Sequence, residues 1–184
     1  MKIANWITDL GEEKLKARRD DICAYYCNKY MAWGLVEDII DQKAGIDMWA
    51  LDEDFNTIYI QQKFDSFPRT PKNIYCEWDI QWMDNNCNSP GWAKKQNQKQ
   101  DYFHIIFEKH GLVLCFKWVE FQKFLLDNEK VIKQMDLRHK KNTPQKVGDD
   151  NSITTYSLID IEWLGKNYKG FFEKELYKVG EEVV

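Results

Sequence analysis

The sequence predicts a mixed α/β fold, with helices packed on a mixed β-sheet in a single domain over residues 1–184. Helix-like apolar spacing occurs near the N-terminus and again in Glu120–Met135. Strand-like runs fill most of the chain between these segments, and consecutive strands favour a mixed sheet. The 184 residues are 43% hydrophobic and 15% aromatic, which is enough for one domain to bury a core.

Apolar and aromatic residues recur every three or four positions near the N-terminus, among them Ile22, Tyr30 and Trp33. This spacing predicts a helix over residues 11–33, with Gly34 as its stop. Residues 35–41 are expected to add another helical turn. The core of the domain is expected at about residues 35–135, followed by a C-terminal strand and tail over 152–184.

A turn-like cluster, Asp52–Asn56, separates two strand-like runs, Asp47–Leu51 and Thr57–Asp65, and therefore predicts a β-hairpin. Because side chains alternate across a strand, Gln61 and Lys63 must point to the same face.

A third strand is predicted at Ile74–Trp82, where the even-numbered residues are apolar and Glu77 lies on the polar face. The loop before it carries Arg69 and Lys72 and is expected to be exposed. The remaining segments are expected as loops at Met83–Pro90 and Asp136–Asn151, strands at Asp101–Lys109, Leu112–Val119 and Ile153–Leu164, one helix at Glu120–Met135, and a short docked helix around Phe171–Tyr177.

The bulk properties exclude several classes of protein. A net charge of −4 argues against a protein that coats nucleic acid non-specifically, although not against an enzyme with a local basic patch and metal ions. Five cysteines without a CxxC pair indicate reduced thiols in a cytoplasmic protein, and the histidines do not complete a zinc site with Cys23 and Cys27. No apolar run is long enough to cross a membrane, and the charged N-terminus does not fit a signal peptide.

Polar residues on the predicted strands suit metal-dependent phosphodiester hydrolysis. Mg²⁺ (or Mn²⁺) prefers oxygen ligands and is often held by one or two carboxylates. Asp47 can supply a carboxylate, Gln61 an amide oxygen and Gln62 a backbone carbonyl. Lys63 can orient or deprotonate the attacking water, and Glu77 can restore the negative charge that Gln61 lacks.

Each candidate also has an ordinary structural interpretation. Asp47 can cap a turn, Lys63 can be an exposed strand lysine, and Glu77 can form a cross-strand ion pair with it. Trp92 is more simply a packing residue, and the basic segment 94–99 is usually solvated surface.

The ordered set of motifs resembles the PD-(D/E)XK nuclease superfamily, in its Gln-x-Lys variant. The motifs are Gly45-Ile46-Asp47, Gln61-Gln62-Lys63, Glu77, Pro90-Gly91-Trp92 with Lys94 and Lys95, and Asp101-Tyr102. The resemblance covers roughly residues 41–119 and is closest to small nuclease-like proteins of phages and mobile elements. It implies a restriction-endonuclease-like sheet flanked by helices and Mg²⁺-dependent hydrolysis. The departure is Gln61, where the superfamily usually has a carboxylate.

The expected function is therefore a metal-dependent endonuclease acting on DNA, and a phage origin would place it in the host cytoplasm. The residues expected to contact phosphate are Arg69, Lys72, Lys94 and Lys95. An acid on an upstream helix is left open among Asp20, Asp21, Glu37, Asp38 and Asp41. The alternatives are a catalytically silent module that binds nucleic acid or inhibits a host protein, and a nuclease directed at RNA. The oligomeric state, a homodimer included, stays open.

Overall fold

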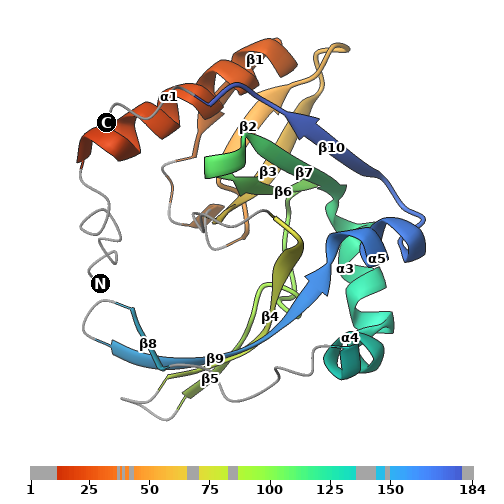
Figure 1. Ribbon diagram of the computed structural model, residues 1–184. Coiled ribbons are helices and arrows are strands. Elements are labelled where there is room, and N and C mark those ends of the chain that lie inside the picture. Colours follow the sequence, from red (N-terminus) through yellow and green to blue (C-terminus); the bar gives the residue numbers. More distant parts are fainter. Residues whose placement is uncertain are drawn as a thin grey trace. The chain divides into compact units, whose positions relative to one another are not determined.

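The computed structural model describes residues 12–36, 38, 40–41, 44–65, 71–82, 87–135, 144–147 and 150–179. These residues form helices and two β-sheets, which confirms the predicted mixed α/β fold (Figure 1). Contacts divide the chain into two compact units, each built from segments that are distant in sequence. The six-stranded unit takes its described residues from 12–71, 97–120 and 170–179, and the four-stranded unit takes them from 72–96 and 121–169. The predicted single-domain organisation stays a prediction.

The six-stranded unit contains a mixed sheet in the order β1-β2-β3-β6-β7-β10. Its strands are β1 (Ala32–Leu35), β2 (Met48–Leu51), β3 (Thr57–Asp65), β6 (Tyr102–Phe107), β7 (Leu112–Lys117) and β10 (Phe172–Leu176). Only β3 and β6 are parallel among these pairs of neighbouring strands. A short 3₁₀ helix, η2 (Glu108–His110), joins β6 to β7.

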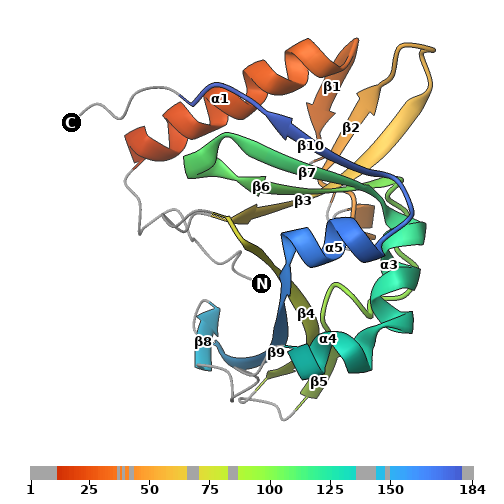
Figure 2. The ribbon, with the colours of Figure 1, turned by 45° about the vertical axis from the view of Figure 1, so that its right-hand side comes forward.

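Helix α1 (Glu12–Lys29) lies along one face of this sheet (Figure 2). Its Tyr25 and Tyr26 are buried against Met48, Ile60 and Ile106 from three different strands. Alternate strand residues supply this apolar face, as the period of a β-strand requires. The opposite face of β3 is therefore the one that carries Gln61 and Lys63.

The predicted N-terminal helix extends too far at its C-terminal end. The helix stops at Lys29, and Ala32–Leu35 pairs with β2 as a strand. Gly34 is part of that strand, where a Cβ atom would lie 2.8 Å from the Trp49 indole nitrogen. Aromatic spacing continues past Lys29, but the backbone hydrogen bonds of this stretch go to β2.

The predicted hairpin is confirmed, and β3 has the predicted bounds. Asp52 Oδ1 accepts the backbone N–H groups of Asp54 and Asn56 at 3.0 and 2.8 Å. These bonds close the turn, in which Phe55 has a φ of 62°.

The four-stranded unit contains an antiparallel sheet in the order β5-β4-β9-β8. Its strands are β4 (Asn73–Trp82), β5 (Cys87–Pro90), β8 (Pro144–Val147) and β9 (Asp150–Asp160). Its helices are α4 (Glu129–Met135), α5 (Ile161–Asn167) and the part of α3 (Trp118–Asp127) from residue 121 onward. Ile74, Cys76 and Trp78 are buried, as the alternation predicts, and the Trp78 indole donates to Ser157 Oγ at 2.7 Å.

Several predicted segments differ from the structure. The helix expected over Glu120–Met135 is two helices, α3 (Trp118–Asp127) and α4, separated at Asn128, whose side chain donates to the Phe124 carbonyl. The loops expected at 83–90 and 136–151 contain β5, β8 and the start of β9.

The C-terminal predictions are also corrected. The strand expected to reach Leu164 ends at Asp160, which caps α5 by accepting the Trp163 N–H. The helix expected around 171–177 is strand β10, whose five residues pair with β7. No helix among the described residues combines the length and apolar character needed to cross a membrane.

Candidate functional site

The candidate site is built around the turn at residues 44–47 of the six-stranded unit. Gly45 has a φ of +84°, which suits a residue without a Cβ atom. The Ala44 carbonyl accepts the Lys99 N–H at 2.9 Å, and the Asp47 N–H donates to the Ile60 carbonyl at 3.0 Å. The turn is therefore fixed both to β3 and to the segment that precedes β6.

Asp47 lies directly against the Gln-x-Lys motif. Its Oδ2 accepts the backbone N–H of Gln62 at 2.7 Å, although the two residues are 15 positions apart. This bond holds the carboxylate beside the backbone that joins Gln61 to Lys63. The structure thus brings together Asp47, Gln61 and Gln62, which are the three residues expected to hold a metal ion.

The side chains of the Gln-x-Lys motif diverge as the strand alternation requires. Gln62 Nε2 donates to the Tyr26 hydroxyl at 2.8 Å, so the Gln62 side chain faces α1. Gln61 and Lys63 consequently share the other face. Gln62 can reach a ligand on that side only through its backbone.

Sequence reasoning missed two glutamines at this site, Gln98 and Gln100. Gln100 is 3% exposed, and its Nε2 donates to Gln61 Oε1 at 3.0 Å. A Cβ atom on Gly45 would lie 2.1 Å from Gln98 Oε1 and 2.5 Å from Gln100 Oε1. Both carboxamides therefore lie over the glycine. The alternation Gln-x-Gln just before a predicted strand was the available signal.

Three carboxamide atoms of this cluster are buried without a hydrogen-bond partner among the described residues. They are Gln100 Oε1 and both polar atoms of Gln98. Buried polar groups are normally paired, so this cluster is the least satisfied part of the site.

The atoms at this site that could bind a metal ion are oxygens, from one carboxylate and several neutral amides. Hard cations such as Mg²⁺ and Mn²⁺ prefer such ligands. The described residues contain no group of three or more His, Cys, Asp and Glu side chains placed to hold a metal. A cation here would therefore depend on Asp47 together with neutral oxygens.

The remaining predicted site residues belong to the four-stranded unit or lie outside the described residues. Glu77 is half-buried on β4, where its carbonyl accepts the Ala93 N–H at 3.1 Å. Lys72 is exposed just before β4, Lys95 is half-buried, and Arg69 is not among the described residues. The proposal that Glu77 supplies the charge missing at Gln61 stays a prediction.

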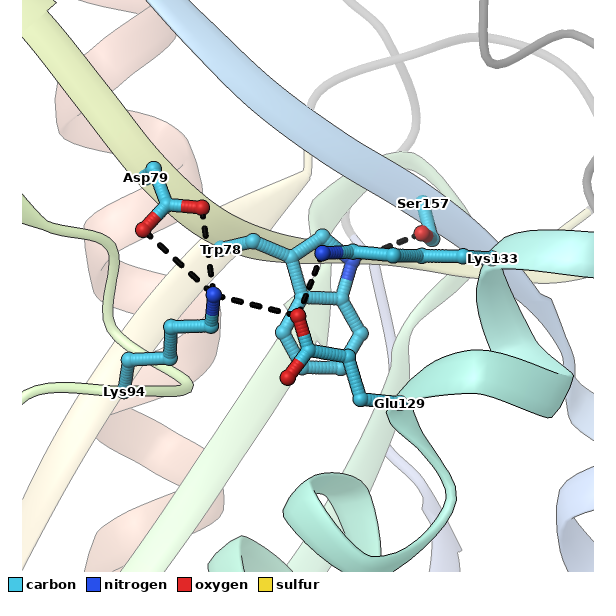
Figure 3. Close-up of polar contacts among 6 residues, drawn as sticks. All are labelled: Trp78, Asp79, Lys94, Glu129, Lys133 and Ser157. Atoms are coloured by element: carbon cyan, nitrogen blue, oxygen red, sulfur yellow. Dashed lines mark hydrogen bonds and ion pairs between the residues drawn. The ribbon is translucent and has the colours of Figure 1, made fainter.

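Lys94 has its charge balanced locally (Figure 3). Its Nζ lies 3.2 Å from Asp79 and 3.0 Å from Glu129, and Lys133 also pairs with Glu129. Partial burial disfavours the charged amine, but the bonds to Glu129 and Asp79 outweigh this effect and raise the pKa of Lys94. This lysine is held as a structural ion pair over Trp78, and such pairing weakens it as a phosphate contact.

The open alternatives from the sequence are placed as follows. Asp20 is exposed on α1, and Asp38 accepts the Ile40 N–H, so no bond among the described residues draws either of them into the site. Glu37 lies outside the described residues. Neither Cys23 nor Cys27 is part of a disulfide. Trp92 is buried and stacks on Phe121, in agreement with a packing role.

A buried imidazole lies behind the site strand. The Tyr26 hydroxyl lies 3.1 Å from His104 Nδ1, and the two rings stack with centroids 5.9 Å apart. Burial, together with the nearby charge of Lys29, lowers the pKa of His104 to about 3, so His104 is neutral. Gln62, Tyr26 and His104 thus form a polar chain under β3.

Comparisons of the chain with models of protein families, with curated proteins and with solved structures found no match.

Proposed function

We propose that this protein is a metal-dependent nuclease that hydrolyses DNA phosphodiester bonds, acting as an endonuclease. The observation that carries the proposal is the 2.7 Å bond from the Gln62 N–H to Asp47, which sets a carboxylate beside Gln61. Lys63 lies on the same strand face as Gln61. The oxygen-rich donor set, with its unpartnered buried amide oxygens, fits a hard cation.

Asp47, Gln61 and the Gln62 carbonyl would hold Mg²⁺ or Mn²⁺. The bound ion would polarise a phosphate oxygen and offset the charge of the transition state. Lys63 would orient the attacking water or accept its proton, and its ammonium form would offset phosphate charge. The bond to the Gln62 N–H fixes the orientation of Asp47 before substrate arrives.

The test is cleavage of supercoiled plasmid and of single-stranded DNA by the full chain in Mg²⁺ or Mn²⁺. Asp47→Asn keeps an oxygen for the Gln62 N–H but removes the charge, and Lys63→Met removes the amine. Each variant should lose about 100-fold or more of the cleavage rate. Glu53→Gln, an exposed acid in the β2–β3 turn, is the matched control and should cut normally. If Asp47→Asn and Lys63→Met cut as fast as the wild type, the proposal is wrong.

A catalytically silent module is the second candidate, and the neutral Gln61 favours it. Such a module would bind nucleic acid or a host protein without cutting and would show no Mg²⁺-dependent rise in melting temperature. Restoration of cleavage by Gln61→Glu in an otherwise inactive protein would support this candidate. A parallel assay with RNA substrates separates a deoxyribonuclease from a ribonuclease.

A further inference from the structure

We propose that Gln98 and Gln100 are cation ligands at this site, and that their carboxamide oxygens compensate for the missing carboxylate at position 61. This inference rests on the proposed function for the choice of Mg²⁺ or Mn²⁺ as the ion. It assigns a binding role to two residues outside the motifs of the sequence.

The first step is the orientation of Gln100. Its carboxamide is planar, with the nitrogen and the oxygen on opposite sides of the group. The nitrogen is bound to Gln61 Oε1 at 3.0 Å, so the oxygen is turned away from Gln61. That oxygen lies over Gly45, 2.5 Å from the place of a Cβ atom.

The second step is the convergence of two acceptors. Gln98 Oε1 lies 2.1 Å from the same point over Gly45, so the two oxygens converge on one place beside the turn. Two buried acceptors with no N–H or O–H donor among the described residues repel each other. A cation between them would remove this repulsion.

The third step is the position of the negative charge. Asp47 follows Gly45 by two residues, and its carboxylate is fixed against the Gln62 backbone. The Lys99 N–H bond to the Ala44 carbonyl holds the segment with Gln98 and Gln100 against the same turn. One carboxylate with several neutral oxygens is a donor set that Mg²⁺ accepts.

Gly45 provides the space that the two amide oxygens occupy. Any side chain at position 45 would fill the space that the two oxygens occupy, and the φ of +84° would strain it as well. The turn therefore requires Gly45 for the approach of the amides as much as for its backbone conformation.

The experiment measures cation binding by the full chain, by calorimetry with Mg²⁺ and by electron paramagnetic resonance with Mn²⁺. Gln98→Met and Gln100→Met keep the side-chain length and remove the oxygen, so each should weaken binding about tenfold or more. Gln98→Glu adds a charge beside the same point over Gly45 and breaks no hydrogen bond with a described residue, because Gln98 Nε2 has no partner among them, so it should tighten binding about tenfold. Gln96→Met, an exposed glutamine two residues before Gln98, is the control and should bind like the wild type.

The outcomes separate this inference from the proposed function. Cation binding that weakens in Gln98→Met and Gln100→Met supports the inference, even if the protein cuts no nucleic acid. Unchanged binding in both methionine variants, weaker binding in Gln98→Glu, or no binding by the wild type overturns it. A third outcome is cleavage that needs Asp47 and Lys63 but reaches half its maximal rate at the same Mg²⁺ concentration in both methionine variants and the wild type. That outcome supports the nuclease and overturns this inference. Unfolding curves in EDTA show that each variant is folded, and Gln98→Glu provides a gain that misfolding cannot imitate.

Discussion

The hydroxyl group of Tyr26 joins Gln62 to His104 in the polar chain under β3. Its oxygen accepts the bond from Gln62 Nε2, and it also lies 3.1 Å from His104 Nδ1. A hydroxyl group can donate to a neutral imidazole nitrogen or accept from an imidazole N–H, so this contact satisfies Nδ1 in either tautomer. The Nε2 atom of His104 is buried without a partner among the described residues, so a charged His104 would have no stabilising contact at this position.

His104 therefore makes stability depend on pH. Its pKa is about 3 in the folded state, far below that of an unfolded histidine at about 6.5. Above pH 6.5 the residue is neutral in both the folded and the unfolded state, so its titration does not affect stability. As the pH falls from 6.5 toward 3, His104 becomes protonated in the unfolded state but not in the folded state. Stability therefore falls by up to about 1.4 kcal/mol per pH unit. Urea unfolding at pH 6.5 and 5.0 should show a smaller loss in His104→Gln than in the wild type, and parallel losses would contradict this prediction.

The ion pairs of Lys94 contribute to stability and limit its contact with DNA. Its ion pairs with Asp79 and Glu129 are partly exposed, so Lys94→Met should lower the free energy of unfolding by about 0.5–1 kcal/mol. Because the charge of Lys94 is already balanced, the same variant should change DNA affinity less than twofold. The slope of log affinity against log salt concentration should also stay as in the wild type, since no phosphate contact is lost. Lys95→Met in the same loop is the comparison, and fluorescence anisotropy with labelled duplex at several salt concentrations is the measurement. A reduced salt slope in Lys94→Met would instead make this lysine a phosphate contact.

Among the elements, β10 shows why the tail could not be predicted locally. Phe171, Phe172, Leu176 and Tyr177 have a spacing that suits a helix as well as a strand. The segment is a strand because β7 offers it an unpaired edge, and that edge belongs to residues about 60 positions earlier in the chain. Glu173 and Glu175 then lie near Lys29 of α1.

Glu175 should anchor β10 more strongly than Glu173. It accepts hydrogen bonds from Tyr25 and Lys29, whereas Glu173 lies 3.6 Å from Lys29 and is more exposed. Burial alone would raise the pKa of Glu175, but the bonds from Lys29 and Tyr25 outweigh it and lower the pKa. The stabilisation is therefore present when the pH is above the pKa of Glu175 in the unfolded state. It is lost as the pH falls through the lower pKa of Glu175 in the folded state.

Glu175→Gln should cost about 1 kcal/mol at pH 7, after allowance for solvent screening, and Glu173→Gln should cost less. The difference between Glu175→Gln and the wild type should shrink in acid. Urea unfolding at pH 7 and pH 4 is the measurement. Equal costs for the two variants at pH 7 would contradict this ranking, and costs near zero for both would show that β10 is held by its backbone pairing alone.

For the molecule as a whole, local signals predicted the fold class, the β2–β3 hairpin and the bounds of β3. They also placed Gln61 and Lys63 on one face, because strand alternation is a property of neighbouring residues. The contact between Gln61 and Gln100 spans 39 positions and depends on the parallel pairing of β3 with β6. A single sequence carries no local signal for such a pairing, and the same limit applies to the division into two discontinuous units.

The net charge of −4 affects how the whole protein binds DNA, which is itself negatively charged. Long-range repulsion opposes association with DNA, and Lys94 of the four-stranded unit is already paired with Glu129. A cation at Asp47 would then bridge the protein and a phosphate group. The Lys63→Met variant, which should not cut, is expected to bind a labelled duplex about tenfold more tightly in Mg²⁺ than in EDTA. Adding Asp47→Asn to it should abolish this gain, and anisotropy titrations at constant ionic strength measure both. Equally tight binding in EDTA would mean that the protein holds DNA through a surface that does not use Asp47, as a catalytically silent module would.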